Sequence, residues 1–158
     1  MIKKYVVVHF IGILIISAVF YLLANLVEKD LVLKNSVIPP PGVKLPQWLD
    51  SFKFWANCSV TASVLAILLW YVIAQWGIKV NHWLASGKRV IWGLIFILPI
   101  AAAILGFVFT KQAQEGGWYA YLFYILNGLL CYYLATAWFS PLSFKYTPLW
   151  ADKLRRLW

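Results

Sequence analysis

Residues able to bind a metal or a cofactor are few and far apart in this sequence. The two histidines, His9 and His82, and the two cysteines, Cys58 and Cys131, show none of the CxxC, HxxxH or HExxH spacings that hold a metal ion. A haem would need an axial ligand in the middle of an apolar segment, and neither histidine has that position. The sequence therefore predicts no metal site, no cofactor and no catalytic residue.

Acidic residues, which could act as general acids or as proton carriers, all lie outside the long apolar segments. An ionisable group within a membrane is the usual sign of a transport or proton-relay site, because burying its charge costs several kcal/mol. No apolar segment has an acidic or basic residue in its central part, which argues against an ion-coupled transporter or a proton channel. His9, a few residues into the first segment, is interpreted as an interfacial histidine. The acidic residues are Glu28, Asp30, Asp50, Glu115 and Asp152.

The two cysteines are predicted to be unpaired. Cys58 lies near the outer end of the second apolar segment, whereas Cys131 lies about 13 residues into the fourth, roughly 20 Å from the outer face at the rise of a helix. A disulfide needs Cα atoms within about 7 Å of each other. Each cysteine is therefore expected to be a small packing residue.

The composition indicates a membrane protein. Of the 158 residues, 63% are hydrophobic and 12% are charged, whereas a soluble domain is about 45–50% apolar and about 25% charged. So much apolar surface cannot be hidden in one core of this size, so the surrounding solvent must be lipid. The net charge of +9 comes from basic residues that flank apolar segments. No aromatic and basic groove accompanies them, so nucleic-acid binding is not expected.

The apolar segments predict an all-α membrane protein, a four-transmembrane-helix bundle in a single transmembrane domain over residues 1–158. A spanning helix needs about 20 residues, since each adds about 1.5 Å of rise. The first segment is also longer than the apolar region of a signal peptide, which is about 7–15 residues, so it is expected to be a membrane helix. The predicted spans are about 5–27, 55–76, 90–109 and 118–139.

Basic residues predict that both termini are cytoplasmic. With the N-terminus inside, the inner segments hold more Lys and Arg than the outer ones, and all three arginines are inside, as the positive-inside rule requires. The inner residues are Lys3, Lys4, Lys79, Lys88, Arg89, Lys145, Lys153, Arg155 and Arg156; the outer ones are Lys29, Lys34, Lys44, Lys53 and Lys111. A bacterial inner membrane is assumed from this asymmetry and the small size.

The longest polar stretch is the predicted outer loop, residues 28–54. The run of prolines from Pro39 to Pro41 removes backbone donors, so no continuous helix can cross it. After Pro46, large apolar residues recur at helical spacing, beginning with Trp48. This pattern indicates a short interfacial helix with its aromatic side chains at the headgroups, although an irregular aromatic-rich loop is the alternative.

Several uncharged residues inside the spans are predicted to pack the helices together. Asn127, near the middle of the fourth span, needs a partner for its amide, and interhelical hydrogen bonds in membranes are worth around 0.6–2 kcal/mol. Small residues four positions apart lie on one helical face and let backbones approach, while a proline within a span bends its helix. The predicted packing residues are Asn127, Ser59, Ser63, Ala102, Gly106 and Pro99.

The tail, residues 140–158, is predicted to be cytoplasmic and to contain a short interfacial amphipathic helix. On such a helix the tryptophans and leucines gather on one face and the charged residues on the other. A basic amphipathic segment with tryptophans favours anionic lipid headgroups, although it could equally bind a cytoplasmic protein. The residues expected to make these contacts are Trp150, Lys153, Arg155, Arg156 and Trp158.

The leading functional hypothesis is a non-catalytic integral membrane subunit. It would form homo-oligomers and anchor or sense for a larger envelope-associated complex, of the secretion or phage-defence type, with a cytoplasmic or envelope protein as partner. One alternative is an oligomeric pore or channel, with Asn127, Thr136 and Gln75 near the conduction path. The other is a small lipid-modifying membrane enzyme that uses the outer-surface acids Asp50 and Glu115.

Overall fold

A computed structural model describes residues 4–78, 87–140 and 147–148. These residues are helical, apart from connections and one isolated antiparallel bridge between Ile38 and Glu115. The first helix begins as α1, passes into a π-helical segment η1 and ends as α2; the second begins as α3 and ends in the π-helical turn η2. In chain order the elements are α1 (Lys4–Leu22), η1 (Leu23–Leu33), α2 (Lys34–Ser36), α3 (Leu45–Val72), η2 (Ile73–Ile78), α4 (Lys88–Phe109) and α5 (Gly117–Phe139).

Four helices in the described part of the chain are long and apolar enough to cross a membrane: Val7–Ser36, Leu45–Ile78, Lys88–Phe109 and Gly117–Phe139. This confirms the prediction of an all-helical membrane protein. The amphipathic tail helix, with Trp150, Lys153, Arg155, Arg156 and Trp158, lies outside the described residues, as does His82.

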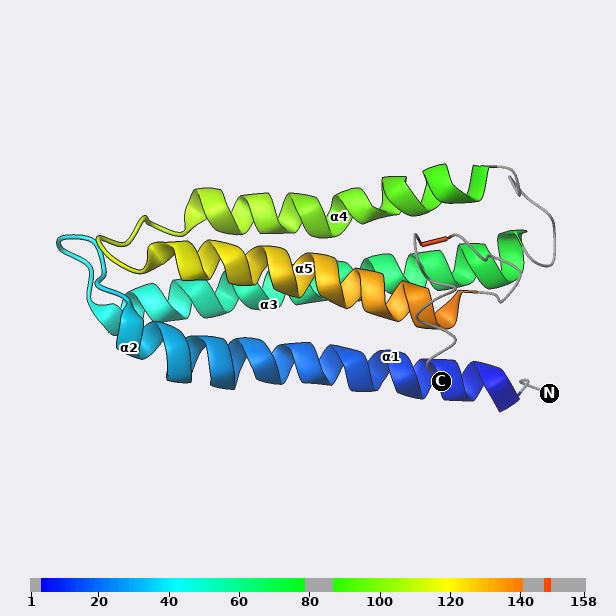
Figure 1. Cartoon of the computed structure of the whole chain (residues 1–158), viewed down its shortest axis with the longest axis horizontal. Helices are drawn as coiled ribbons and strands as arrows, with labels where there is room; N and C mark the ends of the chain where they lie inside the picture. Colours follow the sequence, from blue (N-terminus) through cyan, green and yellow to red (C-terminus); the bar gives the residue numbers. More distant parts are fainter. Residues whose placement is uncertain (1–3, 79–86, 141–146, 149–158) are drawn as a thin grey trace.

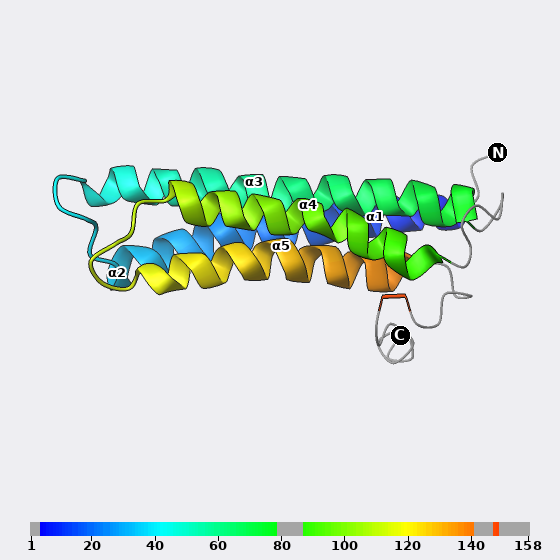
Figure 2. The same cartoon turned by 90° about the horizontal axis from the view of Figure 1, so that it is seen from above.

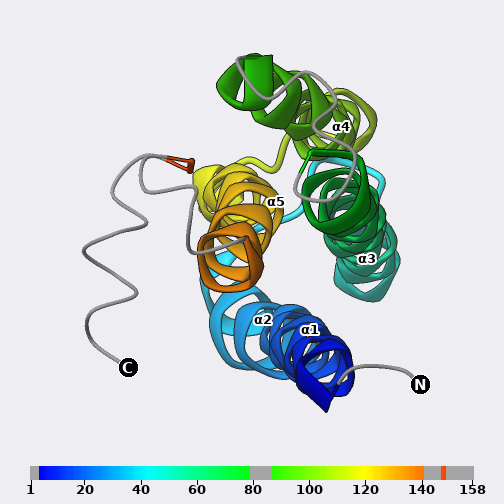
Figure 3. The same ribbon diagram turned by 90° about the vertical axis from the view of Figure 1, so that its right-hand side faces the viewer.

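The helices form an antiparallel bundle with α3 and α5 at its centre (Figure 1). Seen from one end, α1 and α4 lie on opposite sides of the α3–α5 pair (Figure 3). Figure 2 shows the same helices running side by side along the long axis, with the α2–α3 and α4–α5 connections at one end. This arrangement leaves much of α1 and α4 on the surface, which suits helices that face lipid.

The helices extend well into the segment predicted as the outer loop 28–54. The first helix continues to Ser36 and α3 already begins at Leu45, so the connection covers residues 37–44. The helix stops where the prolines begin, and Pro46 lies in the first turn of α3, where its missing N–H needs no partner. The helical alternative after Pro46 is therefore correct. The predicted position of the aromatic side chains at the headgroups is wrong for Trp48, which is buried in the bundle with 2% of its surface exposed.

The two connections at this end are held to each other. The Ile38 N–H donates to the Glu115 carbonyl at 3.1 Å, and the Trp48 indole N–H donates to the Lys111 carbonyl at 2.8 Å. Gly116 has φ of +71°, and a Cβ there would come within 2.0 Å of the Ser36 carbonyl oxygen, so only glycine fits. We call this end the outer end, following the predicted orientation.

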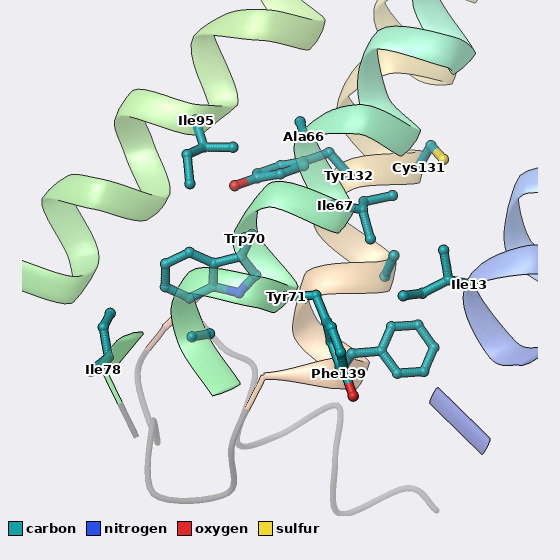
Figure 4. Close-up of a cluster of buried hydrophobic side chains, with 12 residues drawn as sticks. Ile13, Ala66, Ile67, Trp70, Tyr71, Ile78, Ile95, Cys131, Tyr132 and Phe139 are labelled. Atoms are coloured by element: carbon teal, nitrogen blue, oxygen red, sulfur yellow. The ribbon is translucent and has the colours of Figure 1, made fainter. Parts of the chain in front are cut away.

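Buried side chains form two clusters, one in each half of the bundle. The outer cluster is Ala24, Leu33, Val37, Trp48, Leu49, Phe52, Ala56, Ala103, Ala120 and Tyr124. The inner cluster, drawn in Figure 4, is Ile13, Ala66, Ile67, Trp70, Tyr71, Ala74, Ile78, Ile95, Cys131, Tyr132, Ala135 and Phe139. Along α3 and α5, buried polar residues separate the two clusters. We call Glu28, Ser59, Ser63 and Asn127 the polar layer.

Candidate functional site

Glu28 is buried inside the bundle, although the sequence places it beyond the first span. Only 1% of its surface is exposed, and its partner is Asn127 on α5, which has no exposed surface. Asn127 is ten residues from the start of α5 and twelve from its end, which is about 15 Å and about 18 Å at helical rise. Glu28 therefore lies level with the middle of a membrane-length helix. The structure thus places Glu28 within the helix Val7–Ser36, eight residues before its end, and not in the predicted outer loop 28–54.

The π-helical segment η1 directs Glu28 inward. Its buried residues are Ala24, Glu28 and Leu33, at spacings of four and five. In a regular α-helix, five residues turn the chain by about 500°, so Leu33 would point about 140° away from Glu28. The widened turns of a π-helix, with hydrogen bonds from i to i+5, bring both side chains to one face. Such segments are rare and are frequently found at functional sites.

The hydrogen bonding of the Glu28–Asn127 pair is incomplete. Asn127 Nδ2 donates to Glu28 Oε2 at 2.8 Å, while Glu28 Oε1 and Asn127 Oδ1 are buried and accept no hydrogen bond. Within the described ranges, no Lys or Arg forms an ion pair with Glu28, and the nearby pair between Lys29 and Asp30 is at the surface. A buried charge needs a counter-charge or several hydrogen bonds, and a buried acceptor without a donor costs about 1–3 kcal/mol.

Close contacts between α3, α4 and α5 fix Asn127 in place. The Ser59 hydroxyl donates to the Tyr124 carbonyl at 3.2 Å, and the Ser63 hydroxyl donates to the Gly128 carbonyl at 2.9 Å. A Cβ on Gly128 would lie 2.9 Å from Ser59 Oγ and 3.2 Å from the Pro99 carbonyl oxygen. Gly128 therefore lets the α4 backbone at Pro99 and the Ser59 side chain of α3 approach α5 next to Asn127.

Two of the three packing residues predicted on α4 are buried against α5. Pro99 and Gly106 are buried, and α4 continues past Pro99. A Cβ on Gly106 would lie 3.1 Å from the Tyr124 ring, so the small residue allows that ring to approach. Ala102 is only partly buried, because the buried face of α4 passes through its neighbour Ala103.

A second polar feature runs along the groove where the first helix meets α3. We call Tyr21, Asn25, Asn57 and Thr61 the polar seam. The Tyr21 and Thr61 hydroxyls share a hydrogen bond, and Asn25 Nδ2 donates to Asn57 Oδ1 at 3.0 Å. Thr61 is exposed and the other three are partly exposed, so the seam reaches the surface of the bundle.

The other polar residues considered for a conduction path bond within the chain. Gln75 Nε2 donates to the Phe139 carbonyl at 3.0 Å, and Thr136 Oγ1 accepts from the Trp92 indole N–H at 3.0 Å. Both lie towards the inner end, whereas Asn127 lies at the middle of α5. These two side chains therefore lie at another depth than Asn127 and have their own hydrogen-bond partners.

The remaining residues that could carry chemistry are separate. His9 Nδ1 lies 3.3 Å from the Tyr71 hydroxyl, and Cys58 and Cys131 are free thiols. In the part of the chain that the structure describes, no three His, Cys, Asp or Glu side chains gather to hold a metal ion. Asp50 and Glu115 are exposed at the outer end.

Glu28 is the site residue that the sequence analysis missed, and a signal for it exists. Apolar residues continue beyond it through Leu31, Val32 and Leu33, and the first helix-breaking residue is Pro39.

Comparison with protein-family models, with curated proteins and with solved structures found no match. The polar layer and the polar seam are the features of the described residues that bear on function.

Proposed function

We propose that this protein is a non-catalytic integral membrane subunit that assembles with further copies of itself. In this proposal it anchors or senses for a larger envelope-associated complex. The observation that supports assembly is the polar seam, because it places amide and hydroxyl groups on a lipid-facing surface.

The Asn57 side chain leaves one polar group of the seam without a hydrogen bond. Its Oδ1 accepts from Asn25, but its amide nitrogen has no acceptor within the described residues. The side chain is partly exposed, and the exposed residues within about one helical turn of it are Lys53, Phe54 and Thr61. Lipid tails offer no acceptor, so this N–H group is stabilised only if another protein segment covers the seam.

A second copy of this chain is the occupant that fits best. An amide carries both a donor and an acceptor, so Asn57 of one copy can pair with Asn57 of another across a two-fold axis. Thr61 lies one helical turn further along the same groove and adds a hydroxyl to the same face. Interhelical hydrogen bonds of this kind contribute about 0.6–2 kcal/mol each in membranes.

Cysteine cross-linking in native membranes tests the assembly. A Thr61→Cys variant is made in a Cys58→Ser, Cys131→Ala background, and Leu98→Cys on the exposed face of α4 is the matched control. We expect mild oxidation to give a covalent dimer with Thr61→Cys and none with Leu98→Cys. Equal cross-linking at both positions, or a monomeric mass for the native protein by light scattering in detergent, would overturn the proposal.

A further inference from the structure

We propose that the Glu28 carboxyl group and the Asn127 amide form a proton-binding site inside the bundle, at which Glu28 takes up and releases one proton. The inference goes beyond the assembly described above and does not depend on it, because the pair lies within one chain.

Burial and hydrogen bonding are the first support. Both side chains are almost completely enclosed, and each has one oxygen that accepts no hydrogen bond, Glu28 Oε1 and Asn127 Oδ1. These two buried acceptors lack a donor. One added proton on the carboxyl group supplies that donor and also removes the buried charge.

The chemistry of the amide allows a hydrogen bond in either state. When Glu28 is a carboxylate, Asn127 Nδ2 donates to it, which is the geometry observed at 2.8 Å. When Glu28 is a neutral acid, its O–H can donate to Asn127 Oδ1 after the amide turns over, because an amide presents a donor on one side and an acceptor on the other. Asparagine is therefore a suitable partner for a carboxyl group that changes its protonation state.

The groups around the pair leave Glu28 as the titrating residue. On α5 the titratable neighbour is Tyr124, within electrostatic range of Glu28, and its hydroxyl is bonded to Thr110 Oγ1 at 2.6 Å. α3 contributes the non-titrating Ser59 and Ser63, with its charged Asp50 and Lys53 exposed further out. On the first helix the next charged residues are Lys29 and Asp30, which pair with each other at 3.6 Å, followed by Lys34.

A pocket lies between the outer part of the first helix and the start of α3. It has a volume of about 250 Å³ and is lined by Lys29, Asp30, Lys34, Leu45, Pro46, Leu49 and Asp50. One of the residues that line the pocket, Lys29, directly follows Glu28 in the chain.

Labelling with the apolar reagent dicyclohexylcarbodiimide tests the inference on the full-length protein in membranes. The O–H of a neutral carboxyl group adds across one C=N bond, and the adduct rearranges to a stable N-acylurea, so the peptide gains the whole reagent and loses nothing. We expect mass spectrometry to find the label on Glu28. The rate of labelling should fall about tenfold for each unit of rising pH once the carboxyl group is mostly deprotonated, because only the protonated form reacts.

Controls separate the proton site from the alternatives. Glu28→Gln should abolish this label, Glu28→Asp should retain pH-dependent labelling, and Glu115→Gln should leave the Glu28 label unchanged. An unlabelled Glu28, or a labelling rate that does not change with pH, would overturn the inference. Protection of Glu28 by added Na⁺ at constant pH would also overturn it, in favour of a cation site. The labelling uses the native sequence, so it stays informative even if a variant fails to fold.

Discussion

The inner cluster and the polar layer are both buried, but they satisfy their polar groups differently. In the inner half, the Trp70 indole N–H donates to Ser140 Oγ at 2.8 Å and the Trp92 indole N–H donates to Thr136 Oγ1 at 3.0 Å. In the polar layer, Glu28 and Asn127 each keep an oxygen without a donor. Complete hydrogen bonding is typical of a region that stabilises a fold, whereas a buried carboxyl group kept at a cost is typical of a functional site.

The largest expected loss of stability is in the inner cluster. Trp70→Ala removes a side chain with 1% of its surface exposed and leaves Ser140 without its indole donor. We expect the free energy of unfolding in mixed detergent micelles to fall by about 3–5 kcal/mol, the usual cost of removing a buried tryptophan. Trp118→Ala is the control, because Trp118 is 58% exposed. A loss equal to that of the control would mean that the inner cluster does not hold the bundle together.

A double-mutant cycle measures how strongly Glu28 and Asn127 are coupled in the polar layer. Asn127→Leu removes the one donor that the Glu28 carboxyl group has among the described residues, so we expect a loss of about 1–3 kcal/mol in the free energy of unfolding. Changing both residues to leucine removes both polar groups, and the double variant should lose less than the sum of the two single variants. Purely additive losses would show that the observed hydrogen bond does not couple the two side chains.

The smallest expected effect distinguishes hydrogen bonds between helices from those within one helix. Ser63 Oγ is 2.9 Å both from the Gly128 carbonyl oxygen of α5 and from the Ser59 carbonyl oxygen of its own helix, whereas Ser17 Oγ is 2.7 Å from the Ile13 carbonyl oxygen of its own helix. Ser63→Ala should lower the free energy of unfolding by about 0.6 kcal/mol, the average for such bonds in membranes. Ser17→Ala should cost less, and the reverse order would contradict a role for Ser63 in joining α3 to α5.

The helices could largely be predicted from the sequence because lipid imposes a simple requirement. Every backbone polar group within the membrane must be bonded internally, so long apolar runs become helices. The predicted spans 90–109 and 118–139 agree with α4 and α5 to within two residues at each end. The first two spans were predicted too short, because their polar ends are also helical and pack against neighbouring helices instead of forming loops.

The candidate site could be predicted only in part. Asn127 was recognisable, because an amide in the middle of an apolar run must find a partner. The partner of Asn127 was not recognisable from the sequence, since Glu28 is 99 residues away in the chain and follows the apolar run that defined the first span. Its burial depends on the length of the first helix and on the π-helical turns of η1, neither of which follows from hydrophobic periodicity.

The sequence by itself determined that the long apolar segments form helices and that no helix continues through the proline run, since these follow from apolar length and from proline. Only the tertiary structure decided which polar residues share a depth in the bundle. An acidic residue beyond an apolar run is free to face water at the surface. The packing of the first helix against α3 and α5 encloses Glu28 beside Asn127 and so makes it the candidate site.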